Sequence, residues 1–299
     1  MDNTVGTLKT QGACLDIGPV DRPLLICGGA YGNLHALTAL LDIASENGFP
    51  PGRIVHTGDA VAYCGDPEAT TVLLRDSGVH AIQGNVEESL SAGMSDCGCG
   101  FEPGSACDRL SEQWFAFADA RMSRESRRWM GSLPLSLEFT MGGHKARVVH
   151  GGVREINRFY FESSPAQDLE REFEAAGVDV IVAGHSGLPF TRELGNRVWH
   201  NSGALGMPAN DGTPRVWYSV LAPVEEGISF VHHALGYDHR AARARMAEGG
   251  LPAGYASAIE SGLWPSLSVL PPAERERTGV PVDAGALGRV WMSQKGEVA

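Results

Sequence analysis

Four polar side chains stand beside glycine at the ends of strand-like segments. They are Asp59, Asn85, His150 and His185. Ligands of open α/β sheets bind outside the carboxyl ends of the strands, so we expect these side chains to meet at one edge. A carboxylate oxygen, an amide oxygen and two imidazole nitrogens suit a divalent Mn, Zn or Fe ion. Each residue alone could be a turn or capping residue, but their shared context predicts a metal site.

A second group with potential chemistry is the cysteine segment. Cys97, Cys99 and Cys107 fall within eleven residues, among glycines that allow tight turns. Three thiolates and one outside ligand could hold a second metal, although the spacing differs from the Cys-x₂-Cys pair of common zinc sites. Packed reduced thiols and a redox-active pair are the alternatives. We expect reduced thiols in an acidic protein without an export signal, and a loop that returns to the metal edge.

The segments that must position these groups alternate between strand and helix. Short apolar runs that end at glycine or at His150 predict strands, and stretches with apolar residues at helical spacing predict helices, one of them capped by Asn33. Alternation of this kind indicates an α/β fold with helices covering a sheet. The expected strands are 23–27, 53–56, 79–82, a hairpin of 135–139 with 145–149, 179–183, 197–200, 215–220 and 227–231; the expected helices are 33–44, 67–76, one from 86, and 237–263 with a break at 249–252.

The organisation that follows is one domain with two appendages. Residues 1–22 are polar and predict a loose N-terminal arm, residues 23–235 carry the strands and motifs, and residues 236–299 predict a helical or irregular C-terminal extension of the same domain. His232 and His233 lie beyond the main motifs, and we expect them at the surface.

Composition narrows the class of function. The chain of 299 residues carries 24 Lys and Arg against 36 Asp and Glu, a net charge of −12, which argues against sequence-independent nucleic-acid binding. No run of about 18 apolar residues predicts a membrane helix, and the first residues lack a signal-peptide pattern. We expect a cytoplasmic enzyme that acts on a small, anionic molecule, with its oligomeric state left open.

The order of short motifs resembles the calcineurin-like metallophosphoesterases, nearest to their bacterial phosphodiesterase and diadenosine-tetraphosphatase-like branch. The resemblance runs from about residue 23 to 222. It rests on Gly-Asn-Leu-x-Ala-Leu at 32–37, Gly-Asp-x-Val-x-Tyr at 58–63, Gly-Asn at 84–85, His-Gly at 150–151, Gly-His at 184–185, and Asn-Ser-Gly-Ala-Leu-Gly-Met-Pro at 201–208. It implies a β-sandwich flanked by helices in an αββα arrangement, with metal at the strand ends.

The departures from that family are concentrated at one of its two ions. The family's first motif is Asp-x-His-Gly-Asn, and this chain has Gly29 and Tyr31 in place of the Asp and His. Gly187 replaces the second His of Gly-His-x-His, and Val86 replaces the usual catalytic His. The ligands that the family uses for its other ion remain as Asp59, Asn85, His150 and His185. The resemblance therefore implies a degenerate first metal site and an intact second one.

The function that this implies is a metal-dependent phosphoester hydrolase with a remodelled site, rebuilt for one ion or holding a second ion differently, and with weak activity on generic phosphodiesters. Tyr31, Asn33, Glu87 and Arg154 are candidates for the substrate pocket. A metalloenzyme of another class on the same fold, using iron or thiols without hydrolysis, and a non-catalytic metal-binding protein are the alternatives. The metal content of the purified protein would distinguish hydrolysis from redox chemistry, because stoichiometric iron with visible absorption favours redox chemistry.

Overall fold

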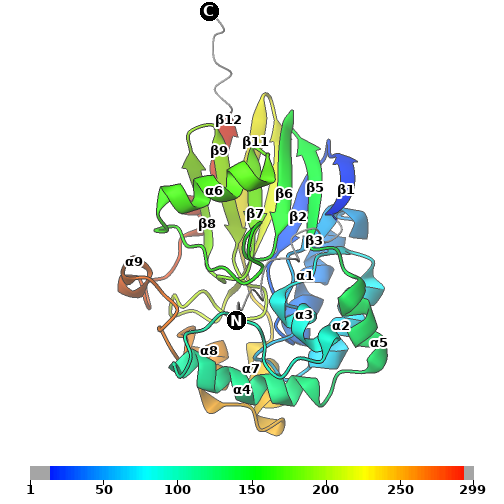
Figure 1. Cartoon of the computed structure of the whole chain (residues 1–299), viewed down its shortest axis with the longest axis vertical. Coiled ribbons are helices and arrows are strands. Elements are labelled where there is room, and N and C mark those ends of the chain that lie inside the picture. The colour runs from blue at the N-terminus through cyan, green and yellow to red at the C-terminus, as the bar shows by residue number, and fades with distance from the viewer. Residues whose placement is uncertain (1–13, 293–299) are drawn as a thin grey trace, which may run out of the picture.

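The computed structural model describes residues 14–292, which form two six-stranded sheets packed face to face (Figure 1). The first sheet has the order β1-β5-β6-β7-β9-β8 and the second β12-β11-β10-β2-β3-β4. The strands of the first sheet are β1 (Cys14–Pro19), β5 (Ser136–Met141), β6 (His144–Val149), β7 (Val180–Ala183), β8 (Pro189–Leu194) and β9 (Arg197–Ser202); those of the second are β2 (Leu24–Cys27), β3 (Ile54–His56), β4 (His80–Ala81), β10 (Val216–Val224), β11 (Gly227–Leu235) and β12 (Arg289–Met292).

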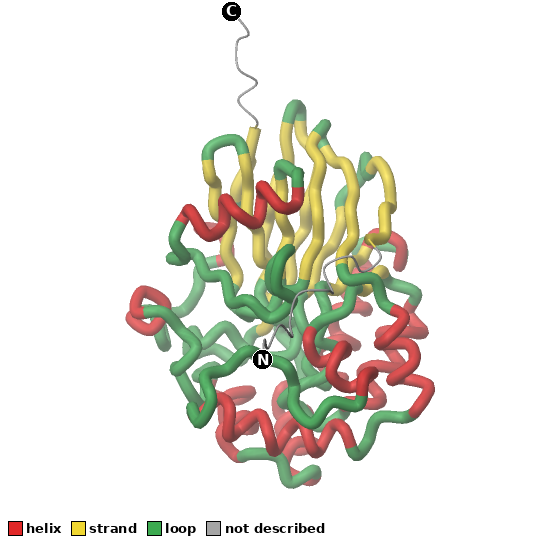
Figure 2. Tube along the Cα trace, in the orientation of Figure 1, coloured by secondary structure: helices red, strands yellow, loops and turns green. Residues whose placement is uncertain are grey.

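Helices cover the outer faces of both sheets and gather below them. Figure 1 shows α6 across the face of the first sheet, and Figure 2 shows most of the other helices in the half of the molecule beyond the strand ends. The helical elements are α1 (Leu34–Glu46), η1 (Pro51–Arg53), α2 (Pro67–Ser77), α3 (Asn85–Ala92), α4 (Ala106–Asp119), α5 (Arg124–Ser132), α6 (Ala166–Ala176), α7 (His239–Glu248), α8 (Ala253–Ser261), α9 (Pro272–Glu276) and α10 (Ala284–Leu287).

The core between the sheets comes from alternate residues of their strands. Leu24 and Ile26 of the second sheet pack with Phe139, Val148 and others of the first, all buried. The outer faces are covered in the same way, since α6 buries Leu169 and Phe173 against the first sheet and α1 buries Leu37 and Leu40 against the second. The expected α/β class with αββα layering is confirmed.

The pairing pattern brings the carboxyl ends of several strands to one edge. In the second sheet β2, β3 and β4 run parallel, and in the first sheet β6, β7 and β9 run parallel. The strand–helix alternation requires this, because each helix returns the chain to the start of the next strand. The loops after β3, β4, β6 and β7 therefore share one side of the molecule.

Several elements differ from the sequence expectations. Residues 14–19, placed in a loose arm, form β1 and pair in parallel with β5, because Leu15 and Ile17 lie in a run that can extend the sheet edge. The part of the arm before residue 14 lies outside the described residues. Strands β8 and β12 and helices α5 and α6 were not predicted. Between residues 14 and 292 no helix is long and apolar enough to cross a membrane.

Candidate metal centre and adjoining pocket

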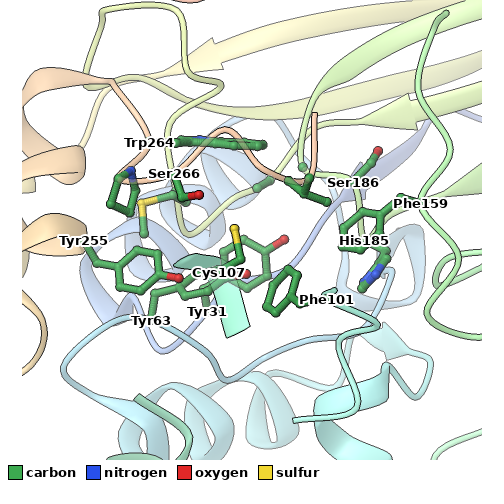
Figure 3. A pocket seen from close by; sticks show the side chains of 15 residues that line it. Tyr31, Tyr63, Phe101, Cys107, Phe159, His185, Ser186, Tyr255, Trp264 and Ser266 are labelled. Atoms are coloured by element: carbon green, nitrogen blue, oxygen red, sulfur yellow. The ribbon is translucent and has the colours of Figure 1, made fainter. Parts of the chain in front are cut away.

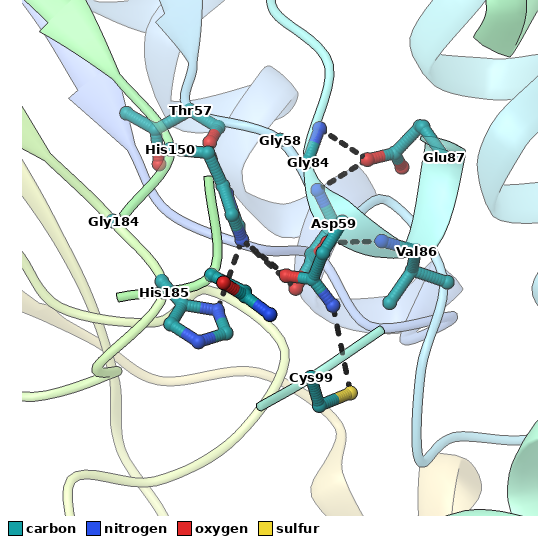
Figure 4. A network of polar contacts seen from close by, with 12 residues as sticks. Thr57, Gly58, Asp59, Gly84, Val86, Glu87, Cys99, His150, Gly184 and His185 are labelled. Carbon is teal, nitrogen blue, oxygen red and sulfur yellow. Dashed lines mark hydrogen bonds and ion pairs between the residues drawn. The ribbon is translucent and has the colours of Figure 1, made fainter. Parts of the chain in front are cut away.

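Three of the four predicted donors, Asp59, His150 and His185, lie together at the strand ends in Figure 4, and Asn85 contacts His150. Asp59 follows β3, Asn85 is the first residue of α3 after β4, His150 directly follows β6, and His185 follows β7. His150 Nε2 is 3.0 Å from Asn85 Oδ1, 3.1 Å from His185 Nδ1 and 3.2 Å from Asp59 Oδ2. The structure thus brings the four polar atoms together.

Neighbouring groups aim the lone pairs of these atoms at that point. His150 Nδ1–H donates to the Thr57 carbonyl at 2.7 Å, which leaves Nε2 as the acceptor nitrogen. The Asn85 amide nitrogen donates to the Cys97 carbonyl at 2.8 Å, so its Oδ1 faces inward. Buried atoms that all carry lone pairs repel one another unless a positive charge stands among them. The donor set therefore fits a cation.

The electrostatics of the cluster favour positive charge at the same place. Burial opposes ionisation of both partners, but the charge and hydrogen bond of Asp59 raise the pKa of His150, and His150 in turn lowers the pKa of Asp59. Burial, followed by the neighbouring His150, lowers the pKa of His185 to about 3. His185 is thus neutral, the form that binds a metal. Asp59, His150 and His185 offer ligand atoms within 4.8 Å of one another.

Comparison with known proteins identifies the family. The sequence profile of the calcineurin-like phosphoesterase superfamily domain matches residues 31–226, more than half of the chain. This chain belongs to that superfamily. No curated protein matches the chain at a significant level.

Solved structures share the superfamily fold. A metallophosphoesterase from Sphaerobacter thermophilus matches with a TM-score of 0.63 and 22% identity over 82% of this chain and 100% of that one. The hypothetical protein PH1004 from Pyrococcus horikoshii matches with a TM-score of 0.65 and 16% identity over 81% and 99%. A putative diadenosine tetraphosphatase matches with a TM-score of 0.45 and 14% identity over 75% and 98%. The first two place almost their whole length on this fold.

The backbone at the donors is unusual for residues with side chains. Asp59 has φ 61° and His185 has φ 57°, both in the left-handed region. Residues other than glycine reach this region at a cost of about 1–3 kcal/mol, and they do so mostly at functional sites. In this superfamily member the strained turns direct two of the four donors inward.

Glu87 holds the Asp59 turn from behind. Its buried carboxylate accepts the N–H of Asp59 at 2.8 Å, of Ala60 at 2.7 Å and of Gly84 at 2.8 Å. Burial and the nearby Asp59 charge nevertheless raise the pKa of Glu87 to about 7. Glu87 ties the start of α3 to the turn after β3 and does not line the adjoining pocket.

Of the other three residues proposed for this pocket, one lines it and two do not. Tyr31 does line it. Asn33 caps α1, since its Oδ1 accepts the Ala36 N–H at 3.1 Å and its amide donates to the Gly206 carbonyl at 3.0 Å. Arg154 is exposed on the loop after β6 and is absent from the pocket lining.

Aromatic rings lie next to Gly29 and Gly187, two positions where the resemblance to the superfamily implies ligands of another ion. A Cβ on Gly29 would lie 2.2 Å from Tyr31 Cε1, so the Tyr31 ring fills the space that an Asp at 29 needs. A Cβ on Gly187 would lie 3.5 Å from Trp264 Cζ2, an ordinary van der Waals contact, and Gly187 has a left-handed φ of 73° that side chains rarely adopt. The Tyr31 ring therefore leaves no room for a side chain at position 29.

The cysteine segment lies beside the donors but not as three thiolates. Cys97 and Cys99 are joined by a disulfide, with Gly98 in the left-handed conformation between them. The expectation of reduced thiols is therefore wrong for this pair, because the turn at Gly98 lets the two sulfurs meet. Cys99 Sγ lies 3.5 Å from the Asn85 amide nitrogen. Cys107 is free and separate, contacting Ser268 Oγ at 3.1 Å.

A pocket of about 570 Å³ adjoins the donors (Figure 3). His185 forms part of one wall, and Tyr31 and Cys107 also line it. Sequence reasoning missed most of this lining, because the residues come from segments far apart in the chain that share no motif. The missed aromatic residues are Tyr63, Phe101, Tyr255 and Trp264.

Proposed function

We propose that this chain is a metal-dependent phosphoester hydrolase with a single-ion site. The observation that supports the proposal most is the convergence of Asn85 Oδ1, His185 Nδ1 and Asp59 Oδ2 within 3.0–3.2 Å of His150 Nε2. Superfamily membership adds the reaction class. The blocked space at Gly29 argues for one ion instead of two.

The chain's own residues divide the work in this proposal. Asp59, Asn85, His150 and His185 would hold the ion, which when bound supplies Lewis acidity toward a phosphoryl oxygen and an activated water. Thr57 fixes the His150 tautomer, and Glu87 fixes the Asp59 turn. Val86 offers no proton to a leaving group, and general acid help is typically worth ~10²–10⁴-fold. Esters with poor leaving groups should therefore react slowly.

Metal titration tests the proposal. We expect the purified chain to bind one Mn²⁺ by calorimetry, and His150→Ala or Asp59→Asn to weaken binding by more than about 100-fold, since even outer partners of ligands are worth 10–100-fold. His233→Ala, a partly exposed histidine away from the donors, is the matched control. Binding of two ions, or variants that bind as tightly as the control, would contradict a single-ion site.

A second candidate is a redox metalloenzyme on the same fold. It is favoured by one contact, the 3.5 Å approach of Cys99 Sγ to the Asn85 amide nitrogen. Stoichiometric iron with visible absorption in the purified protein would favour it over hydrolysis. A small anionic substrate and a cytoplasmic location stay predictions under either candidate.

A further inference from the structure

The pocket beside His185 is walled by aromatic rings from both ends of the chain. Tyr31 and Tyr63 come from loops that follow β2 and β3, and Phe159 comes from the loop after His150. Tyr255 of α8, which lies beside Tyr63, and Trp264, just beyond α8, lie across the pocket from Phe159 and His185 (Figure 3). The last two lie outside residues 31–226, so the C-terminal extension supplies a wall that the superfamily domain does not.

The rings are fixed in place before any ligand arrives. The Trp264 indole N–H donates to the Pro208 carbonyl at 2.7 Å, and its backbone N–H donates to Asn210 Oδ1 at 2.8 Å. Tyr63 and Tyr255 stack with centroids 4.5 Å apart. A rigid aromatic surface loses little conformational entropy on binding, which favours a flat partner.

One ring connects the pocket to the metal centre. Phe159 lies against the His185 imidazole, with centroids 4.1 Å apart and planes tilted by 34°. A group seated between Phe159 and Trp264 is thus next to a donor of the ion. The pocket and the four donors form one continuous site.

The pocket carries almost no charge. Among the described residues that line it there is no Lys, Arg, Asp or Glu. Burial raises the pKa of Tyr255 far above the ordinary value, so its phenol stays neutral. A ligand with additional phosphates or a carboxylate would meet no cationic side chain in this pocket to replace its hydration, whereas an uncharged group needs none.

We propose that this pocket binds a flat, uncharged aromatic group, and that the substrate is a phosphoester of that group. The part of this proposal that concerns the phosphoryl group rests on the proposed function, and the part that concerns the aromatic group does not. In the hydrolysis, a P–O bond to water forms and the P–O bond to the aryl oxygen breaks. The aryl oxygen leaves with the bonding electrons, and the proton from water passes to solvent or to the phenol. An aryloxide leaves more readily than an alkoxide, which suits a site with Val86 in place of an acid.

Binding of the aromatic half is tested without metal. 4-Methylumbelliferone, a flat fluorescent phenol, is titrated into the EDTA-treated chain at a pH where it is neutral. We expect saturable binding that weakens at least tenfold in Trp264→Leu and in Tyr255→Leu and is largely kept in Trp264→Phe. Trp129→Leu on α5, a partly buried tryptophan outside the pocket, is the matched control, and thermal melting verifies that each variant is folded.

The phosphoryl half is tested with phenylphosphonate, hexylphosphonate and methylphosphonate in the presence of Mn²⁺. We expect phenylphosphonate to bind at least tenfold tighter than the other two. Hexylphosphonate binding as tightly as phenylphosphonate, or umbelliferone binding that is unchanged in folded Trp264→Leu and Tyr255→Leu, would overturn the aromatic assignment. Umbelliferone binding that depends on Trp264 would support the aromatic pocket. If phosphonate binding is then no tighter with Mn²⁺ than without it, the proposed hydrolytic function is wrong and the pocket assignment stands.

Discussion

At the scale of single residues, Gly29 and Tyr31 act as a pair. The left-handed backbone of Tyr31, with φ 54°, turns its ring back over Gly29, where any Cβ would overlap it. The tyrosine is in turn 5.0 Å from the ring of Tyr63 in an edge-on contact. A ligand of the superfamily's first ion can thus be restored only if the tyrosine is removed as well.

This pairing predicts a non-additive effect on stability. Gly29→Asp alone should lower the free energy of unfolding by about 1–3 kcal/mol, the usual cost of overpacking a filled site. Adding Tyr31→His should recover much of that loss, because the smaller ring vacates the space. Urea denaturation measures both, and Gly52→Asp, where a Cβ meets nothing within 4 Å, is the control. Additive losses in the double variant would show that the two positions are independent.

At the scale of elements, α3 and the turn after β3 are held together by one carboxylate. Glu87, in the first turn of α3, accepts backbone N–H groups from Asp59 and Ala60 across the gap and from Gly84 in its own cap. Carboxylate acceptors at a helix N-terminus are favoured by the helix dipole as well. The position of Asp59 relative to Asn85 therefore depends on this contact.

Glu87→Gln should loosen that connection without removing a metal donor. An amide has one acceptor oxygen, so at least one N–H is left unpaired, which costs about 1–3 kcal/mol in a buried site. We expect that loss in urea unfolding and Mn²⁺ affinity reduced by roughly 10–100-fold, as for other groups that orient ligands. Glu112→Gln on the exposed face of α4 should change neither. Unchanged Mn²⁺ affinity in Glu87→Gln would remove its positioning role.

Local patterns account for the elements that sequence alone predicts correctly. Short buried runs ending at glycine predicted β2, β3 and β7. Asn33, which precedes a run with helical spacing, was also predicted as the cap of α1, and in the structure its side chain accepts the Ala36 N–H. The missed elements carry weaker patterns. Strand β1 is mostly exposed and gains its order from pairing with β5, a contact that is remote in sequence.

The same distinction applies to the site. Asp59 and His185 were found because each follows a glycine just after a strand, and strand ends meet at one edge. The aromatic pocket could not be found, since Tyr63 and Trp264 meet only through the packing of α8 and its following loop. The Cys97–Cys99 disulfide also depends on a backbone turn that composition does not reveal.

At the scale of the whole molecule, the sandwich encloses histidines that must stay neutral. His200 is fully buried, with Nδ1 2.9 Å from Thr191 Oγ1 and Nε2 2.7 Å from Ser219 Oγ. His232, expected at the surface, is buried instead, with its ring centroid 4.7 Å from that of His200. Its side chain points inward along β11, as those of Ile228 and Phe230 do.

Acid should therefore weaken the fold through this pair. Burial, aided by the nearby His233 and Arg289, lowers the pKa of His232 to about 4, and burial holds that of His200 well below the ordinary value. A histidine with a depressed folded-state pKa contributes stability that is present above its unfolded pKa of about 6.5 and is lost as the pH falls toward the folded value. For His232 this loss is roughly 3 kcal/mol between pH 6.5 and 4, at about 1.4 kcal/mol per pH unit for one proton. Urea unfolding across this range should show a shallower decline in His232→Gln than in the wild type, while His35→Gln on α1 follows the wild type. Parallel curves for all three proteins would mean that His232 is accessible to protons in the folded state.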